Sequence, residues 1–214
     1  NIFQTNKAIL NYHRITQDNN SGRPNDELAV SAKTFKEQLI FLKKYYNFVS
    51  LNNLLDFQKK NRPSISITFD DGYKDNLTNA LPILNELNIP ATIYIITKFY
   101  QNDFIVWWME LQDYIWNNSK NIEFTYNKKN YNFSIKNDLE KRKCFFKLRT
   151  IIKKLDNAEQ IEFLEIITKS NVRKNFRDEF LTKDDLKVLS SHPLITIGAH
   201  SHNHLSLKNL DKNE

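Results

Sequence analysis

The fold is decided by the stretch Ser64-Ile65-Ser66-Ile67-Thr68-Phe69-Asp70-Asp71-Gly72-Tyr73. Its apolar residues alternate with small polar ones, which is the pattern of a β-strand. The strand ends in two adjacent carboxylates, Asp70 and Asp71, and Gly72 then lets the backbone turn sharply. Because α/β folds carry their chemistry at the carboxyl ends of parallel strands, these residues are candidate site residues. Taken alone, the same residues are equally consistent with a surface turn.

Histidines gather after a second apolar run, Leu194 to Ala199. Three of the five histidines, His200, His202 and His204, fall within five residues. The spacing of four places His200 and His204 on one side of a helical turn or tight loop, as metal chelation requires. Two imidazoles and one carboxylate make a three-ligand site with open positions for water and substrate. The alternatives are accidental clustering and a solvated histidine-rich loop.

Composition indicates one soluble domain and adds little about its chemistry. The chain has 214 residues, of which 40% are hydrophobic, and contains no 18-residue apolar run that would span a membrane. Its net charge of +6 comes from dispersed lysines and arginines. These favour a solvated helix face or attraction to anionic glycans, lipid-linked sugars or membrane surfaces over nucleic-acid binding, for which no motif is present. Cys144 lies in an amphipathic pattern and is interpreted as a core thiol.

Strands and helices alternate along most of the chain. A capping box, Thr34-x-x-Glu37, predicts the start of one helix, and Thr182-x-x-Asp185 predicts the start of another. Strands are expected at residues 8–12, 64–69, 91–96 and 195–199, with a helix through residues 77–87. This βα repeat is typical of a parallel sheet.

The middle of the chain departs from that alternation. An aromatic-rich helix is expected at residues 106–116, a hairpin at 122–135, and two helices at 139–155 and 158–169. We interpret residues 103–178 as an insertion beside the sheet. Trp107 and Trp108 are either core anchors of this insertion or a sugar-stacking wall near the cleft.

Two motifs in the right order carry a family resemblance. Thr68-Phe69-Asp70-Asp71-Gly72-Tyr73 and His200-Ser201-x-x-His204 resemble the polysaccharide deacetylase family, also called the NodB-homology or carbohydrate esterase 4 domain. The segment Ile9-Leu10-Asn11-Tyr12-His13-Arg14 resembles the branch that includes poly-N-acetylglucosamine deacetylases. The resemblance covers most of residues 7–207. It implies an α/β fold, namely an irregular (β/α) barrel of the NodB-homology type with a helical and hairpin insertion.

The resemblance also implies an incomplete end. Members of the family carry further segments and barrel strands after the position of His204, whereas this chain stops at Glu214. We therefore expect a single domain over residues 1–214 that lacks its C-terminal strands.

The activity implied is a metal-dependent hydrolase that removes N-acetyl groups from an amino-sugar polysaccharide or oligosaccharide. In this resemblance Asp71, His200 and His204 hold the metal and Asp70 is the general base. Zinc best fits two histidines and one aspartate, although the same ligands would accept cobalt, nickel, manganese or iron. His13 matches a circularly permuted arrangement in which an early histidine protonates the leaving amine. Its alternative is a histidine that is simply packed at a strand end.

Two rival functions stay open at this point. One is a deacetylase or deformylase of a lipid-linked sugar in envelope biosynthesis, and the other is a metal-free remnant that binds glycans. The expected partner is an N-acetylated glycan, without nucleic acid and without a transmembrane span. A bacterial envelope, periplasmic or secreted location is favoured, and a cytoplasmic one stays open. The sugar, the polymer length, the metal and the oligomeric state are not determined by the sequence.

Overall fold

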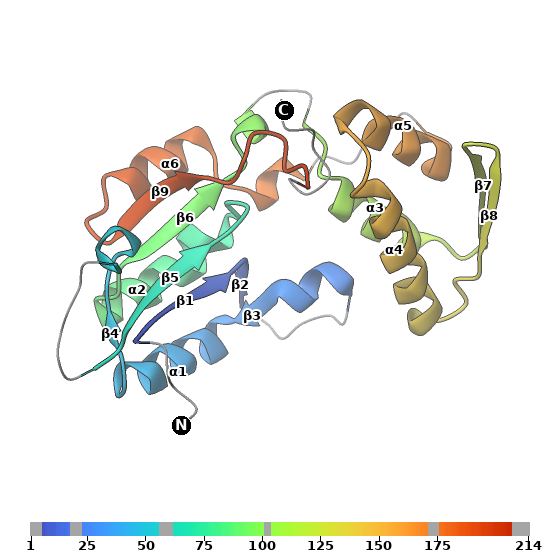
Figure 1. The fold of residues 1–214 in the computed structure, drawn as a ribbon. Helices are drawn as coiled ribbons and strands as arrows, with labels where there is room; N and C mark the ends of the chain where they lie inside the picture. Colours follow the sequence, from blue (N-terminus) through green and yellow to red (C-terminus); the bar gives the residue numbers. More distant parts are fainter. Residues whose placement is uncertain (1–5, 18–22, 56–61, 101–103, 171–175, 207–214) are drawn as a thin grey trace.

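The structure is a computed structural model that describes residues 6–17, 23–55, 62–100, 104–170 and 176–206. Its centre is a parallel sheet in the order β1-β5-β6-β9, and β4 pairs with the start of β5 (Figure 1). The sheet strands are β1 (Lys7–Tyr12), β4 (Asn47–Phe48), β5 (Ser64–Phe69), β6 (Ala91–Ile95) and β9 (Ile195–Ala199). The expected parallel sheet is therefore confirmed. Because its strands are parallel, their carboxyl ends lie at one edge.

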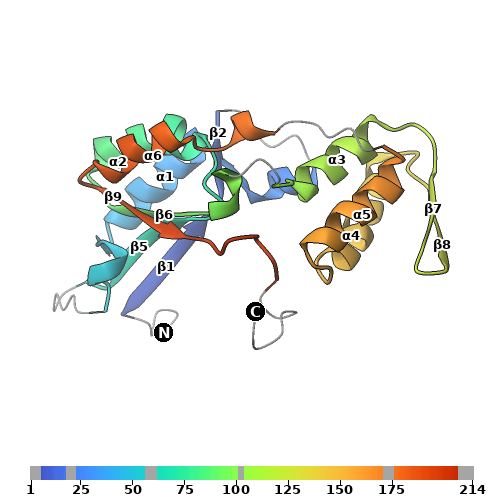
Figure 2. The same cartoon turned by 90° about the horizontal axis from the view of Figure 1, so that it is seen from above.

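Three helices cover one face of this sheet (Figure 2). They are α1 (Ala32–Lys43), α2 (Leu81–Leu87), which continues a π-helical turn at Asn76–Ala80, and α6 (Lys183–Ser190). The buried apolar residues Phe35, Leu84 and Leu189 of these helices pack with Ile67 and Phe69 of β5. Burial of this apolar surface is the main force that holds the helices to the sheet.

The opposite face of β5 is buried but polar. Ser66 donates a hydrogen bond to the carbonyl of Val49 over 2.9 Å, and Thr68 donates one to Oδ1 of Asn11 over 2.9 Å. Successive strand residues alternate between faces, so this polar row continues toward Asp70. One face of β5 builds the core, and the other leads to the candidate site.

Residues 104–170 form a second unit with its own core. It contains α3 (Trp107–Asn117), α4 (Asp138–Ile152) and α5 (Asn157–Thr168), together with the hairpin β7 (Ile122–Tyr126) and β8 (Lys129–Phe133) (Figure 1). The expected elements of this region are confirmed. Their shared core includes Trp107, Trp108, Phe145 and Phe163, and also Cys144, which is buried as expected. Whether this unit is an insertion into the family fold stays a prediction.

The first helix begins at a different residue from the one that the sequence predicts. The first helix does not begin at the predicted Thr34 capping box, because Ser31 is the N-cap and its side chain accepts a hydrogen bond from the amide of Thr34. The short strands β2 (Arg14–Thr16) and β3 (Ala29–Ser31) pair with each other in parallel and lead directly into that cap.

The central sheet is open: among the described residues, neither β1 nor β9 pairs with a further strand. A closed barrel and missing C-terminal strands remain predictions.

The second capping box is confirmed, since Thr182 and Asp185 cap α6 reciprocally. Within the described residues, every helix is too short or too polar to cross a bilayer.

Candidate metal and catalytic site

A strained turn presents the paired aspartates at the end of β5. The amide of Asp70 donates to the carbonyl of Tyr12 over 2.9 Å and so continues the pairing of β5 with β1. Asp71 and Gly72 then adopt left-handed backbone conformations with φ of 71° and 74°. A Cβ on Gly72 would lie 2.9 Å from Cγ2 of Ile95, so the turn passes directly against β6. Such a conformation costs free energy for a non-glycine residue and is typical of functional sites.

A second tight turn presents the histidines after β9. The amide of His200 donates to the carbonyl of Ile95 over 2.7 Å, which anchors the start of the loop beside β6. Ser201 and His204 have φ of 57° and 54°, and the hydroxyl of Ser201 accepts a hydrogen bond from the amide of His204 over 3.0 Å. Ser201 thereby fixes the turn that carries His204. His202 points elsewhere, with its Nδ1 2.8 Å from Oγ1 of Thr97.

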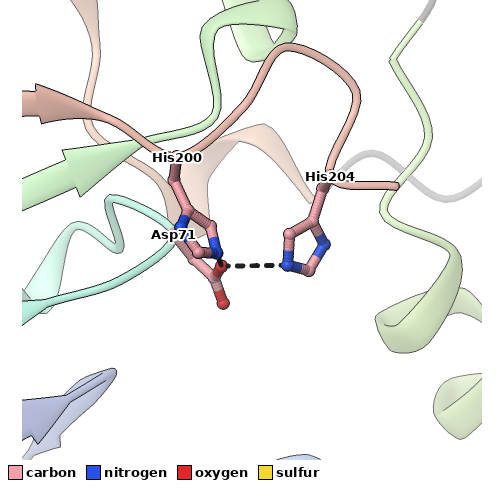
Figure 3. Close-up of side chains that lie close together, drawn as sticks. All are labelled: Asp71, His200 and His204. Carbon is pink, nitrogen blue, oxygen red and sulfur yellow. Dashed lines mark ion pairs between the residues drawn. The ribbon is translucent and has the colours of Figure 1, made fainter. Parts of the chain in front are cut away.

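The three predicted metal ligands converge (Figure 3). Nε2 of His200 lies 3.5 Å from Oδ1 of Asp71, and Nε2 of His204 lies 3.4 Å from the same oxygen. One ligand atom from each residue lies within 4.8 Å of the others. Among the described residues, this is the one group of three such side chains with that spacing. Two nitrogens and one oxygen therefore face a common point.

The electrostatics of these ligands fit a cation. Burial raises the pKa of Asp71 to about 7, the neighbouring Asp70 raises it further, and Lys153 opposes both. Burial lowers the pKa of His204 to about 3, assisted by the charges of His200 and Lys153, so His204 is neutral at pH 7. Oδ1 of Asp71, the oxygen that both imidazoles face, is buried without a hydrogen-bond partner. A divalent cation would offset the negative charge of the buried Asp71 carboxylate and would be coordinated by the neutral imidazole of His204. The residues present therefore fit a metal.

Asp70 lies beside the three candidate ligands but has different hydrogen-bond partners. Its Oδ2 accepts a 2.7 Å hydrogen bond from Nδ2 of Asn11, and Asn11 in turn accepts one from Thr68. Oδ1 of Asp70 lies 3.9 Å from Nδ1 of His200. Asn11 is part of β1, directly opposite Thr68 of β5. The sheet register thus places Asn11 to orient Asp70, and nothing in the sequence alone indicated this role.

His13 follows β1 and lies close to Asp70. Its Nε2 lies 4.0 Å from Oδ2 of Asp70, and its carbonyl accepts a 2.9 Å hydrogen bond from Nδ2 of Asn76. Burial lowers the pKa of His13, Asp70 raises it and His200 lowers it. The side chains of all five residues singled out from the sequence therefore lie close to one another.

A cavity of about 310 Å³ opens beside the ligands. Its walls come from both halves of the molecule: Trp107, Lys153, Gln160, Ala199, His200, Ser201, His204, Leu205 and Ser206. The ring of Trp108 packs edge-on against His204 with centroids 4.8 Å apart, and its Nε1 donates to the hydroxyl of Tyr73 over 3.0 Å. Both tryptophans are buried core residues, yet Trp107 lines the cavity and Trp108 supports a ligand. The core-anchor interpretation is confirmed, and sugar stacking at the cavity stays a prediction.

Comparison with known proteins shows similarity to polysaccharide deacetylases over part of the chain. Residues 57–142 match the family model of polysaccharide deacetylases. The poly-beta-1,6-N-acetyl-D-glucosamine N-deacetylase of Staphylococcus aureus (strain MSSA476) is 34% identical over 109 residues, which cover 44% of this chain and 38% of that protein. Over these residues the chain is similar to polysaccharide deacetylases. The resemblance read from the two motifs is confirmed.

Further proteins are similar to this chain at lower sequence identity. The protein of the same name from Staphylococcus epidermidis is 28% identical over 110 residues, covering 45% of this chain and 38% of the relative. The chain thus spans well under half the length of these two relatives. Among solved structures, IcaB from Ammonifex degensii is 25% identical, covers 44% of this chain and 40% of its own, and has a TM-score of 0.38. The BpsB deacetylase domain from Bordetella bronchiseptica is 17% identical, covers 92% and 55% respectively, and has a TM-score of 0.42.

Proposed function

We propose that this protein is a metal-dependent hydrolase that removes N-acetyl groups from an amino-sugar glycan. The observation that carries the proposal is the convergence of one carboxylate and two imidazoles beside a second, separately held carboxylate. The family supports the reaction type, and the names of its Staphylococcus relatives support a β-1,6-linked N-acetylglucosamine polymer as substrate. An irregular (β/α) barrel with residues 103–178 inserted remains the fold that we propose for the whole domain.

Asp71, His200 and His204 would hold the metal. Held by these ligands, a divalent cation would supply Lewis-acid chemistry, lowering the pKa of water and polarising an acetyl carbonyl. Two nitrogens and one carboxylate oxygen suit zinc best, and cobalt, nickel, manganese and iron are alternatives. The Trp108 ring against His204 and the hydroxyl of Ser201 on the amide of His204 keep this ligand in place.

Asp70 is the proposed general base. Its carboxylate accepts a proton from water as the water oxygen bonds to the acetyl carbon. Asn11 donates to Oδ2 of Asp70, which fixes the carboxylate and leaves Oδ1 directed toward His200.

His13 is the proposed general acid. When the carbon–nitrogen bond breaks, the nitrogen keeps the electron pair and takes a proton, so that a sugar amine and acetate are released. The imidazolium form of His13 would provide that proton; burial lowers the pKa of His13, and the charge of Asp70 opposes this shift and favours the imidazolium. The 4.0 Å distance between His13 and Asp70 supports this role, because the two groups can then act on the nitrogen and the carbon of one amide bond.

The test is acetate release from β-1,6-linked N-acetylglucosamine oligomers by the zinc-loaded protein. We expect hydrolysis that chelator abolishes and added zinc restores, and at least about a hundredfold slower turnover with Asp70→Asn. Metal binding without hydrolysis of any acetylated oligomer would contradict the proposal. Oligomer binding that is indifferent to metal would instead favour a glycan-binding remnant.

A further inference from the structure

Residues 104–170 bring a cation to the candidate site. Lys153, at the C-terminal end of α4, lines the same cavity as His200 and His204. Its charge acts on the pKa of both Asp71 and His204, and Arg149, one helical turn earlier, acts on His204 in the same sense. The next residue, Lys154, is exposed like Lys153 but is not part of the cavity wall.

The backbone around Lys153 is firmly held. Its amide donates to the carbonyl of Arg149 over 3.0 Å. The buried side chain of Gln160 donates to the carbonyls of Ile152 and Leu155, at 3.3 Å and 3.2 Å, on either side of Lys153. Gln160 itself lines the cavity. This turn therefore presents Lys153 from a fixed position.

The charge of Lys153 bears on the products of the proposed reaction. Each hydrolysis replaces a neutral acetamide by an amine, which is an ammonium near neutral pH. Lys153 lines the same cavity of about 310 Å³ as His200 and His204, so a sugar bound in it beside the reacting one would lie close to Lys153. An ammonium on that sugar would face the lysine. Like charges across a site discriminate between otherwise similar ligands.

We propose that Lys153 directs the enzyme toward sugars whose neighbours still carry acetyl groups, by repelling a neighbouring free amine. This inference rests on the proposed deacetylase function and adds a specificity-determining residue to it. At a partly exposed site the Coulomb repulsion corresponds to about a three- to tenfold preference. The enzyme would consequently space its products along the chain.

The experiment compares two β-1,6-linked tetramers, one fully acetylated and one with a single free amine beside an acetylated sugar. The measured quantity is the ratio of their kcat/KM values at one pH near neutrality. We expect the wild-type protein to prefer the fully acetylated tetramer about three- to tenfold, and Lys153→Met to reduce this ratio toward one. Lys153→Arg and the control Lys154→Met should both keep the preference. A ratio that Lys153→Met leaves unchanged would overturn the inference.

A binding measurement separates this inference from the proposed function. The Asp70→Asn protein is titrated with each tetramer, and the fluorescence of the tryptophans beside the cavity is followed. Tighter binding of the fully acetylated tetramer, lost with Lys153→Met, supports the role of Lys153 even if no tetramer is hydrolysed. Equal binding of both tetramers by the protein that retains Lys153 would refute it whatever the turnover.

Discussion

Metal binding should stabilise this protein strongly, and the effect should depend on Asp71 but not on Asp70. Asp71 follows β5, whereas His200 and His204 follow β9, and β6 separates these two strands in the sheet. A metal would therefore link strands that do not pair with each other. At a zinc concentration of about 100 times Kd, ligand binding adds about 2.7 kcal/mol to the free energy of unfolding. For a chain of this size that corresponds to a rise of about 5–10 °C in Tm.

The assay is a thermal melt with chelator and with zinc, repeated for Asp71→Ala and Asp70→Asn. The quantity compared is the zinc-induced shift of each protein, so that any change in the metal-free Tm cancels. Asp71→Ala removes the oxygen that both imidazoles face and should lose most of the shift. Asp70→Asn should keep it, and calorimetry should give a zinc affinity close to that of the unaltered protein. An equal loss in both variants, or a full shift in Asp71→Ala, would refute the assignment of the pair.

Three further predictions follow from the same contacts. His13→Ala should leave zinc affinity intact and lower turnover on an N-acetylglucosamine oligomer by at least about a hundredfold, measured as acetate release. Asn11→Ala removes a hydrogen bond to the Asp70 carboxylate and should lower kcat about tenfold to a hundredfold with an unchanged KM; Asn47→Ala, at the far end of the sheet, is the control. Gly72→Ala should destabilise the fold by about 1–3 kcal/mol in a urea melt, because its φ is positive and its Cβ would collide with β6. Unchanged acetate release by His13→Ala, an unchanged kcat of Asn11→Ala, or an unchanged urea midpoint of Gly72→Ala would contradict the corresponding prediction.

The grouping of Asp71, His200 and His204 was predictable because its signals in the sequence are local. The alternation of residues 64–69 specifies a strand, and a strand must end where Gly72 turns the chain. The spacing of His200 and His204 likewise belongs to one short loop. What remained was to bring two loops together, and parallel strands achieve this because their carboxyl ends share an edge. For the same reason His13, which follows β1, lies close to Asp70, which follows β5.

The partners of these residues were not predictable, because they depend on register and on packing between distant segments. Asn11 reaches Asp70 only because β1 pairs with β5 so that Asn11 lies opposite Thr68. An amphipathic pattern in residues 139–155 indicates which face of a helix is buried, but not against what. It therefore could not show that Lys153, at the end of that helix, would line the cavity of a site formed by other elements.

Backbone strain identifies the site independently of its side-chain chemistry. Outside it, the described non-glycine residues with positive φ are Asn88, Asn127, Lys128 and Lys169, which lie at helix ends or in the hairpin turn where such conformations are common. The remaining three are Asp71, Ser201 and His204. Glycine would adopt each of these conformations more easily, but glycine would abolish two ligands and the hydroxyl that holds His204. The fold therefore accepts strain where side chains must converge on one point. Because a metal at that point would favour the converged arrangement, the cost of the strain and the gain from binding belong to the same equilibrium.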